Sequence, residues 1–188
     1  PPGNGGVGVI RLSGHNTLKI LDKIWIGAIS PPQFEARRCY YGKIKSFIDG
    51  EVIDQVLAVW MRAPHSYTGE DVVEVHAHGG YFLLQSLVEN LVLAGAVLAQ
   101  PGEFTRRAFI HGRIDLVQAE AVADLIAASS RESARLAERQ LSGELSRTIG
   151  KLRNNLTVLR AQMEAMIDFP EDEDVQGLHY DEAEERVA

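Results

Sequence analysis

The chain has 188 residues, of which 45% are hydrophobic, enough for one or two domains with an apolar core. It contains no run of about 18 apolar residues and no charged leader before an apolar stretch, so we expect neither a membrane-spanning helix nor a secretory signal. A single cysteine, Cys39, excludes a disulfide within the chain and fits a cytoplasmic protein in a reducing compartment.

The net charge of −7 is concentrated at one end of the chain. Residues 168–188 include nine acidic side chains and one basic side chain, which leaves 17 acidic and 18 basic residues elsewhere. An acidic segment of this kind is typical of a solvated loop or the start of a helix. Because no basic patch dominates the remainder, composition alone does not indicate a nucleic-acid partner.

Hydrophobic periodicity predicts a mixed α/β domain over the first ~100 residues. The dipeptide Asp49-Gly50 is typical of a two-residue hairpin turn, and Gly95 is suited to end a helix. The expected elements are a buried strand over 7–12, a helix over 17–25, a hairpin of strands over 39–48 and 51–62, a strand over 71–78, a helix that follows Gly79-Gly80, and a short strand over 96–99.

From Pro101 onward the pattern is helical. A helix is expected over 103–111, and capping boxes are indicated by Asp115 with Gln118 and by Ser129 with Glu132. One apolar stripe then predicts a single helix over 130–168, roughly 58 Å long. Such a helix is longer than the first domain is wide, so we expect its stripe to need other helices, from further along the chain or from another subunit. The stripe consists of Leu141, Leu145, Ile149, Leu152, Leu156, Leu159, Met163 and Met166.

The glycine-rich start of the chain, Gly3 to Gly8, resembles a phosphate-binding loop only superficially. No G-x-x-x-x-G-K-[ST] string occurs in the 188 residues, and these glycines precede their strand, whereas those of a dinucleotide-binding fingerprint follow it. The glycines therefore predict a backbone that adopts positive φ or that is closely approached by another group.

Glu74, His76 and His78 alternate along one expected strand and should share a face of the sheet. Two histidines and a carboxylate could bind zinc or iron, although no further Cys or His cluster completes a ligand set. Alternatively, Glu74 could accept hydrogen bonds from the amidine or guanidine edge of a bound ligand. A solvated strand face remains the third interpretation.

Two groups of arginines are ambiguous. Arg106 and Arg107 suit a solvated pair at a turn between helices. Arg131, Arg135 and Arg139 recur at every fourth position and could contact RNA phosphates, although such stripes more often face solvent.

Several segments together resemble the MnmE (TrmE) family of bacterial tRNA-modifying GTPases. The resemblance covers nearly the whole chain, with the segments in the family's order. They are Pro1-Pro2-Gly3-x-Gly5-Gly6-Val7-Gly8-Val9-x-Arg11-x-Ser13-Gly14, Ser66-Tyr67-Thr68-Gly69-Glu70-Asp71-x-x-Glu74 with His78-Gly79-Gly80, Pro101-Gly102-Glu103-Phe104-Thr105-x-Arg107-Ala108-Phe109, Gln118-Ala119-Glu120-Ala121, Ala123-Asp124-Leu125-Ile126 and Ile167-Asp168-Phe169-Pro170.

The resemblance implies an α+β fold with a mixed-sheet, aminomethyltransferase-like tetrahydrofolate-binding domain over 1–112, followed by a long-helix all-α segment over 113–188. It also implies a homodimer that works with the flavoprotein MnmG on the wobble uridine of tRNA. The one-carbon unit would come from 5-formyltetrahydrofolate or methylenetetrahydrofolate.

Family folate contacts fall on Arg11, Glu74 and Arg113, the last of which is often Lys in relatives. A pterin presents its amino group and a ring N–H side by side, and Glu74 is suited to accept both. Arg11 and Arg113 would hold the folate carbonyls or the glutamate tail. The resemblance supplies no catalytic residue and no metal ligand here. GTP, magnesium and potassium would bind a GTPase domain whose P-loop, like the family's Cys-x-Gly-Lys signature, is missing from these residues, so we expect no GTP hydrolysis by this chain alone.

Overall fold

The computed structural model describes residues 5–168, which divide between Ile114 and Asp115 into two compact units. Pro1, Pro2 and Gly3 of the first motif and the acidic segment beyond Asp168 lie outside the described residues. The first unit consists of β1 (Gly5–Ser13), α1 (Thr17–Asp22), β2 (Trp25–Ile26), the 3-10 turn η1 (Pro31–Gln33), β3 (Cys39–Lys45), β4 (Val52–Met61), β5 (Val72–Gly79), α2 (Tyr81–Leu93) and α3 (Glu103–Ile110).

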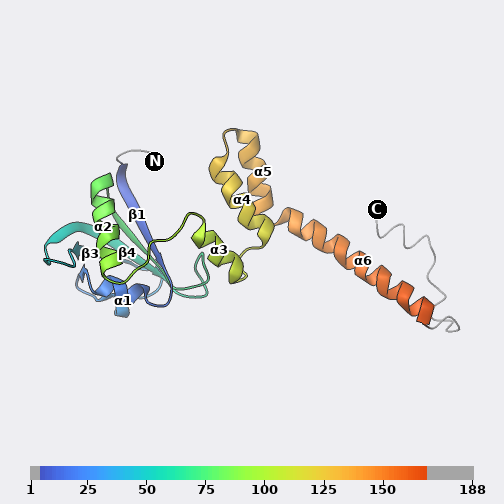
Figure 1. Ribbon diagram of the computed structural model, residues 1–188, viewed down its shortest axis with the longest axis horizontal. Helices are drawn as coiled ribbons and strands as arrows, with labels where there is room; N and C mark the ends of the chain where they lie inside the picture. The colour runs from blue at the N-terminus through green and yellow to red at the C-terminus, as the bar shows by residue number, and fades with distance from the viewer. Residues whose placement is uncertain (1–4, 169–188) are drawn as a thin grey trace. The chain divides into compact units, whose positions relative to one another are not determined.

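The five strands form one sheet in the order β1-β5-β4-β3-β2. Figure 1 labels three of them, β1, β3 and β4, beside α2. The α+β class is confirmed, but all four pairings are antiparallel, which corrects the expectation of a mixed sheet. Parallel neighbours need a long crossover, usually a helix. Here β3 and β4 form a hairpin, and β4 reaches β5 through a loop without a helix, so these three strands alternate in direction.

Alternation along β5 separates a core face from a polar face, as expected. Val73, Val75 and Ala77 are buried beneath α2, where they pack in one cluster with Leu87 and Leu91. Burying a side chain such as either leucine contributes about 1.5–3 kcal/mol. The intervening residues of β5 point to the face opposite α2, and that face carries the candidate site.

Trp25 was expected to end a helix over 17–25 but lies in the short strand β2, because α1 ends at Asp22. Its indole covers Gly42 of β3 so closely that a Cβ on this glycine would lie 2.7 Å from Trp25 Cε2. The indole N–H donates to the Ile29 carbonyl at 2.9 Å. Packing on the sheet, which helical spacing does not reveal, therefore sets the boundary of α1.

Three further expectations in the first unit are corrected. The segment expected as a buried strand is the edge strand β1, in which Leu12 alone is buried. The hairpin loop has four residues between Ser46 and Glu51, whose backbone groups pair at 2.7 Å, instead of a two-residue turn. Residues 96–99 form no strand. The glycine-rich start does meet a close neighbour, because a Cβ on Gly8 would lie 2.5 Å from Leu84 Cδ1.

The second unit contains α4 (Leu116–Ala127), α5 (Arg131–Leu141) and α6 (Glu144–Asp168). The capping box of Asp115 with Gln118 is confirmed. The next box uses Ser130 with Ser133, one residue later than expected, because each serine side chain bonds the backbone of the other. None of the described helices has both the length and the apolar character needed to cross a membrane.

The single helix expected over 130–168 is broken at Ser142 and Gly143. Gly143 has a φ of +77°, a left-handed conformation that ends α5. The side-chain amide of Gln118 then donates to the Leu141 carbonyl at 2.8 Å, which satisfies one free acceptor at the end of α5. At 1.5 Å per residue, the 25 residues of α6 extend roughly 37 Å. No side chain of α6 is buried, and six members of its apolar stripe are exposed: Leu145, Ile149, Leu152, Leu156, Met163 and Met166.

Candidate functional site

Two of the three predicted site residues, Arg11 and Glu74, form an ion pair on the polar face of the sheet. They are direct partners in the register of β1 and β5, although 63 residues separate them in sequence. Arg11 donates through Nε at 2.9 Å and through Nη2 at 2.7 Å, and both bonds reach the same oxygen, Glu74 Oε1. The guanidinium also lies 6.0 Å from the centre of the Phe104 ring on α3.

His76 completes the surroundings of Glu74. Its Nε2 lies 3.3 Å from Glu74 Oε2, the oxygen that Arg11 leaves free. Partial burial acts to raise the pKa of the Glu74 carboxyl, but the hydrogen bonds from Arg11 and His76 outweigh burial and hold that pKa below its ordinary value of 4.5. Glu74 is therefore an ionised acceptor at neutral pH.

The third polar residue of this strand, His78, has a different partner. Its Nδ1 lies 2.7 Å from Asp54 Oδ1, and its backbone N–H donates to Asp54 Oδ2 at 2.9 Å. The two histidines therefore contact different carboxylates instead of converging on one point. Within residues 5–168, no group of three His, Cys, Asp or Glu side chains could hold a metal ion.

Arg113, the third predicted residue, lies beside the loop that precedes β5. A Cβ on Gly69 would be 3.3 Å from Arg113 Cγ, and the Arg113 backbone N–H donates to the Ala108 carbonyl at 2.8 Å. Its side chain takes no part in the Arg11–Glu74 pair. The structure therefore brings two of the three predicted residues together and places the third beside a neighbouring loop.

A second charged cluster, which sequence reasoning did not single out, joins that loop to α3. Arg107 donates to Glu103 Oε1 at 2.6 Å and to Glu70 Oε2 at 3.0 Å, so it is not the solvated arginine that we expected. Ser13 also donates to Glu70 Oε2 at 2.9 Å and bonds the buried Thr68 hydroxyl at 2.7 Å. The one signal in the sequence for this cluster was that its residues lie in the segments that resemble the MnmE family.

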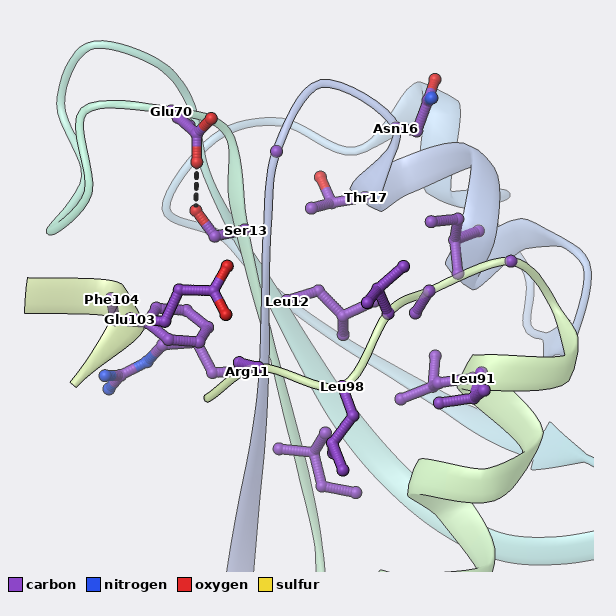
Figure 2. Close-up of a pocket in the computed structure, with 18 of the residues that line it drawn as sticks. Arg11, Leu12, Ser13, Asn16, Thr17, Glu70, Leu91, Leu98, Glu103 and Phe104 are labelled. Atoms are coloured by element: carbon purple, nitrogen blue, oxygen red, sulfur yellow. Dashed lines mark hydrogen bonds between the residues drawn. The ribbon is translucent and has the colours of Figure 1, made fainter. Parts of the chain in front are cut away.

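A cleft of about 560 Å³ follows the outer edge of β1. Figure 2 shows Arg11, Glu103 and Phe104 on one side of this strand and Leu12 and Leu91 on the other. The cleft is also lined by the irregular segment after α2, including Leu98, and by the polar side chains of Ser13, Asn16 and Glu70. Arg11 therefore belongs both to the cleft and to the ion pair with Glu74.

Exposed apolar side chains cross the sheet beside this pair. Val9, Leu57 and Tyr41 are 52%, 42% and 63% exposed, and strand register places them in one row with His76. We call these three residues the apolar row. A row of this kind on an open sheet face is typical of a surface that binds a ligand or another protein.

In the second unit, the arginine stripe is partly neutralised. Arg139 donates to both oxygens of Glu144 at 2.8 Å, an exposed pair at the junction of α5 and α6. Arg131 and Arg135 lie on exposed positions of α5. Contact of this stripe with RNA phosphates therefore stays a prediction that would rest mainly on Arg131 and Arg135.

Comparison with known proteins accounts for both units. The model of the GTP-binding protein TrmE N-terminus matches residues 1–113, and the model of the MnmE helical domain matches residues 116–188. These two matches meet within a few residues of the boundary between the compact units.

Individual relatives point the same way. A protein of Desulfotalea psychrophila is 47% identical over 171 residues, which cover 91% of this chain and 36% of the relative. One of Listeria innocua is 48% identical over 178 residues, covering 95% of this chain and 38% of the relative. Both relatives are named tRNA modification GTPase MnmE. The chain spans less than two fifths of the length of these curated relatives, and it belongs to the MnmE (TrmE) family of tRNA modification GTPases.

Proposed function

We propose that the first unit binds a reduced folate, 5-formyltetrahydrofolate or methylenetetrahydrofolate, with Glu74 as the acceptor for the pterin. The observation that carries this proposal is an ionised carboxylate on an open sheet face, held by Arg11 and His76. A pterin offers an amino group and a ring N–H in parallel, and a carboxylate accepts such a fork through its two oxygens. Each charge-assisted bond contributes about 1.5–3 kcal/mol.

The cleft along β1 provides room for the rest of the ligand. Its volume of about 560 Å³ lies within the range of small-molecule sites, and apolar walls with a few polar groups are typical of them. In this arrangement Arg11 lies between the pterin at Glu74 and the tail of the folate in the cleft. Arg113 holds a folate carbonyl or the glutamate tail, as the family resemblance implies.

In the longer protein, we propose that this unit supplies a one-carbon unit for modification of the wobble uridine of tRNA, together with the flavoprotein MnmG. The relatives' names support tRNA modification and a GTPase. GTP, magnesium and potassium would bind outside the present residues, and the whole protein would work in the cytoplasm.

Calorimetric titration with 5-formyltetrahydrofolate tests the binding proposal. We expect saturable binding by the wild-type chain and at least tenfold weaker binding by Glu74→Gln, which keeps the size of the side chain but removes its charge. The matched control is Glu144→Gln, which disrupts another Arg–Glu pair in the second unit and should leave the affinity unchanged. Equal affinities for wild type and Glu74→Gln would refute Glu74 as the acceptor.

The full-length protein tests the wider role. Glu74→Gln should retain GTP hydrolysis while cells that carry it lose the modified uridine from their tRNA. Loss of both activities would show instead that the substitution damages the whole protein.

We further propose a homodimer, supported by the apolar row on the sheet face opposite α2. Tyr41→Glu places a charge in this row and should shift the molar mass measured by light scattering from dimer towards monomer. Val97→Glu is a control, because Val97 is 91% exposed but lies outside the row. A monomeric wild-type chain at micromolar concentration would contradict the proposal.

A further inference from the structure

The hydrogen-bonding capacity of Glu74 Oε1 is already used within the protein. A carboxylate oxygen has about two acceptor positions. Arg11 fills both positions of Oε1 through Nε and Nη2, and His76 contacts Oε2 at 3.3 Å. A ligand with two parallel donors needs one position on each oxygen. Such a ligand therefore meets an oxygen that is already saturated.

We infer that Arg11 is a specificity-determining residue that competes with the ligand for Glu74 and has to be displaced when the ligand's donor edge binds. This inference rests on the proposed folate-binding function. A guanidinium presents the same kind of donor edge as a 2-amino-4-oxopterin, so Arg11 occupies the position that the pterin requires. Binding exchanges one donor fork for another at the same carboxylate, so the loss of the Arg11 contact offsets part of the affinity that Glu74 supplies.

The surroundings of Arg11 determine what makes the exchange favourable. The side chain is 45% exposed, so it can turn away from Glu74 without opening the core. It already lies along the cleft beside Phe104, whose ring can support the guanidinium there. The two acidic side chains that line the cleft, Glu70 and Glu103, are both bound to Arg107. A displaced Arg11 could therefore pair with a cleft carboxylate only by sharing one that Arg107 already contacts.

A ligand that carries an anionic tail supplies a carboxylate that Arg11 need not share. The site should accordingly select pterins with a carboxylate tail and discriminate against a bare pterin, which displaces Arg11 and offers nothing in return. Arg11 thus opposes binding of one part of the ligand and favours binding of another. A residue that merely added a contact would favour both ligands.

The test compares 5-formyltetrahydrofolate with a bare 2-amino-4-oxopteridine, by calorimetry, on the wild-type chain, Arg11→Met and Arg11→Lys. We expect Arg11→Met to bind the bare pterin about tenfold more tightly, a change typical of one charge-assisted interaction. The folate should bind about tenfold more weakly, because losing the tail contact, about a hundredfold, outweighs the same gain at the pterin. Arg11→Lys keeps the charge but loses the planar fork, so both changes should be smaller. Arg11→Lys also replaces Arg11→Met as the decisive variant if the latter fails to fold.

The outcomes separate the two proposals. If the wild-type chain binds 5-formyltetrahydrofolate, but the variants bind the bare pterin no more tightly than wild type does, competition by Arg11 is refuted and the folate site stands. If the wild-type chain binds no folate, the proposed function fails and the inference fails with it.

Discussion

Glu70 pairs with Arg107 and Glu74 pairs with Arg11, but we expect the two ion pairs to have different roles. Glu74 lies beside the apolar row and pairs with Arg11, which also lines the cleft, so a ligand in the cleft can reach it. Glu70 is tied to Ser13 and to Arg107, so its bonds connect the end of β1 and the loop before β5 to α3. We therefore expect Glu70 to contribute to stability and Glu74 to binding.

The Glu70 contribution should depend on pH. Partial burial acts to raise the pKa of this carboxyl, but hydrogen bonds from Arg107 and Ser13 outweigh burial and lower the pKa below 4.5. Because the folded pKa is the lower one, the stabilisation is fully present above pH 4.5 and is lost as the pH falls through the folded pKa. Glu70→Gln should lower the free energy of unfolding by about 1 kcal/mol at pH 7, measured by urea titration. Between pH 5 and pH 3, that free energy should fall less in Glu70→Gln than in wild type. Glu164→Gln, in the exposed pair with Arg160, is the control with little change at either pH. Parallel pH profiles for Glu70→Gln and wild type would contradict this role.

Gly42 should tolerate no side chain, since Trp25 covers it. A Cβ there would lie 2.7 Å from Trp25 Cε2, and the indole is itself buried. We expect Gly42→Ala to lower the free energy of unfolding by about 1–3 kcal/mol in urea titrations. Gly6→Ala is the control, because no atom lies within 4 Å of its added Cβ. Recovery of stability in Gly42→Ala with Trp25→Leu would identify the indole as the obstacle, whereas a neutral Gly42→Ala would show that Trp25 can shift.

At the residue scale, local pattern predicted which face each side chain occupies but not which side chains meet. The two-residue period of a strand placed Glu74 and His76 on one face, as the structure confirms. The contact of Glu74 with Arg11 depends on β1 pairing with β5, which no local pattern encodes. Only the family resemblance named both residues together. The Arg107–Glu70 contact was missed because Arg107 lies in α3 and Glu70 in the loop before β5, two segments that packing alone brings together.

At the scale of elements, the clearest error concerns the helix expected over 130–168. The apolar steps continue through Ser142 and Gly143, so periodicity predicts one helix, whereas the left-handed Gly143 divides it. The tertiary bond from Gln118 to the Leu141 carbonyl supports this break. Periodicity reports which face is apolar and does not report whether the backbone is continuous, so the stripe was found and the break was not.

Two glycines in this segment should respond in opposite directions to the same substitution. Gly143→Ala forces a Cβ into a left-handed conformation and should destabilise the second unit by about 1 kcal/mol. Gly150 lies within α6 with no atom within 4 Å of its added Cβ, so Gly150→Ala should stabilise by about 1 kcal/mol. Thermal unfolding followed by circular dichroism measures both variants. A gain in Gly143→Ala would mean that α5 and α6 can join into one helix.

At the scale of the whole molecule, the two units differ in how much apolar surface they bury. The first has a core assembled from its sheet, α1 and α2, whereas α6 buries none of its side chains. Leu152→Gln should therefore change the free energy of unfolding of this chain by less than about 0.5 kcal/mol in urea titrations. Ala121→Leu, at a buried position of α4 in the same unit, should lower the free energy of unfolding by about 1–3 kcal/mol. A large loss in Leu152→Gln would show that another surface covers the stripe in solution.

The pairing of β1 with β5 has a consequence for biosynthesis. A ribosome that adds roughly 5–20 residues per second completes Glu74 some 3–13 s after Arg11, because 63 residues separate them. During that interval the nascent first strand has no partner in the sheet, and its glycines and exposed valines are available to chaperones. The strand synthesised first therefore enters the sheet only after its partner β5 has been made. Folate binding by a ribosome-bound chain would therefore show that β1 has paired with β5.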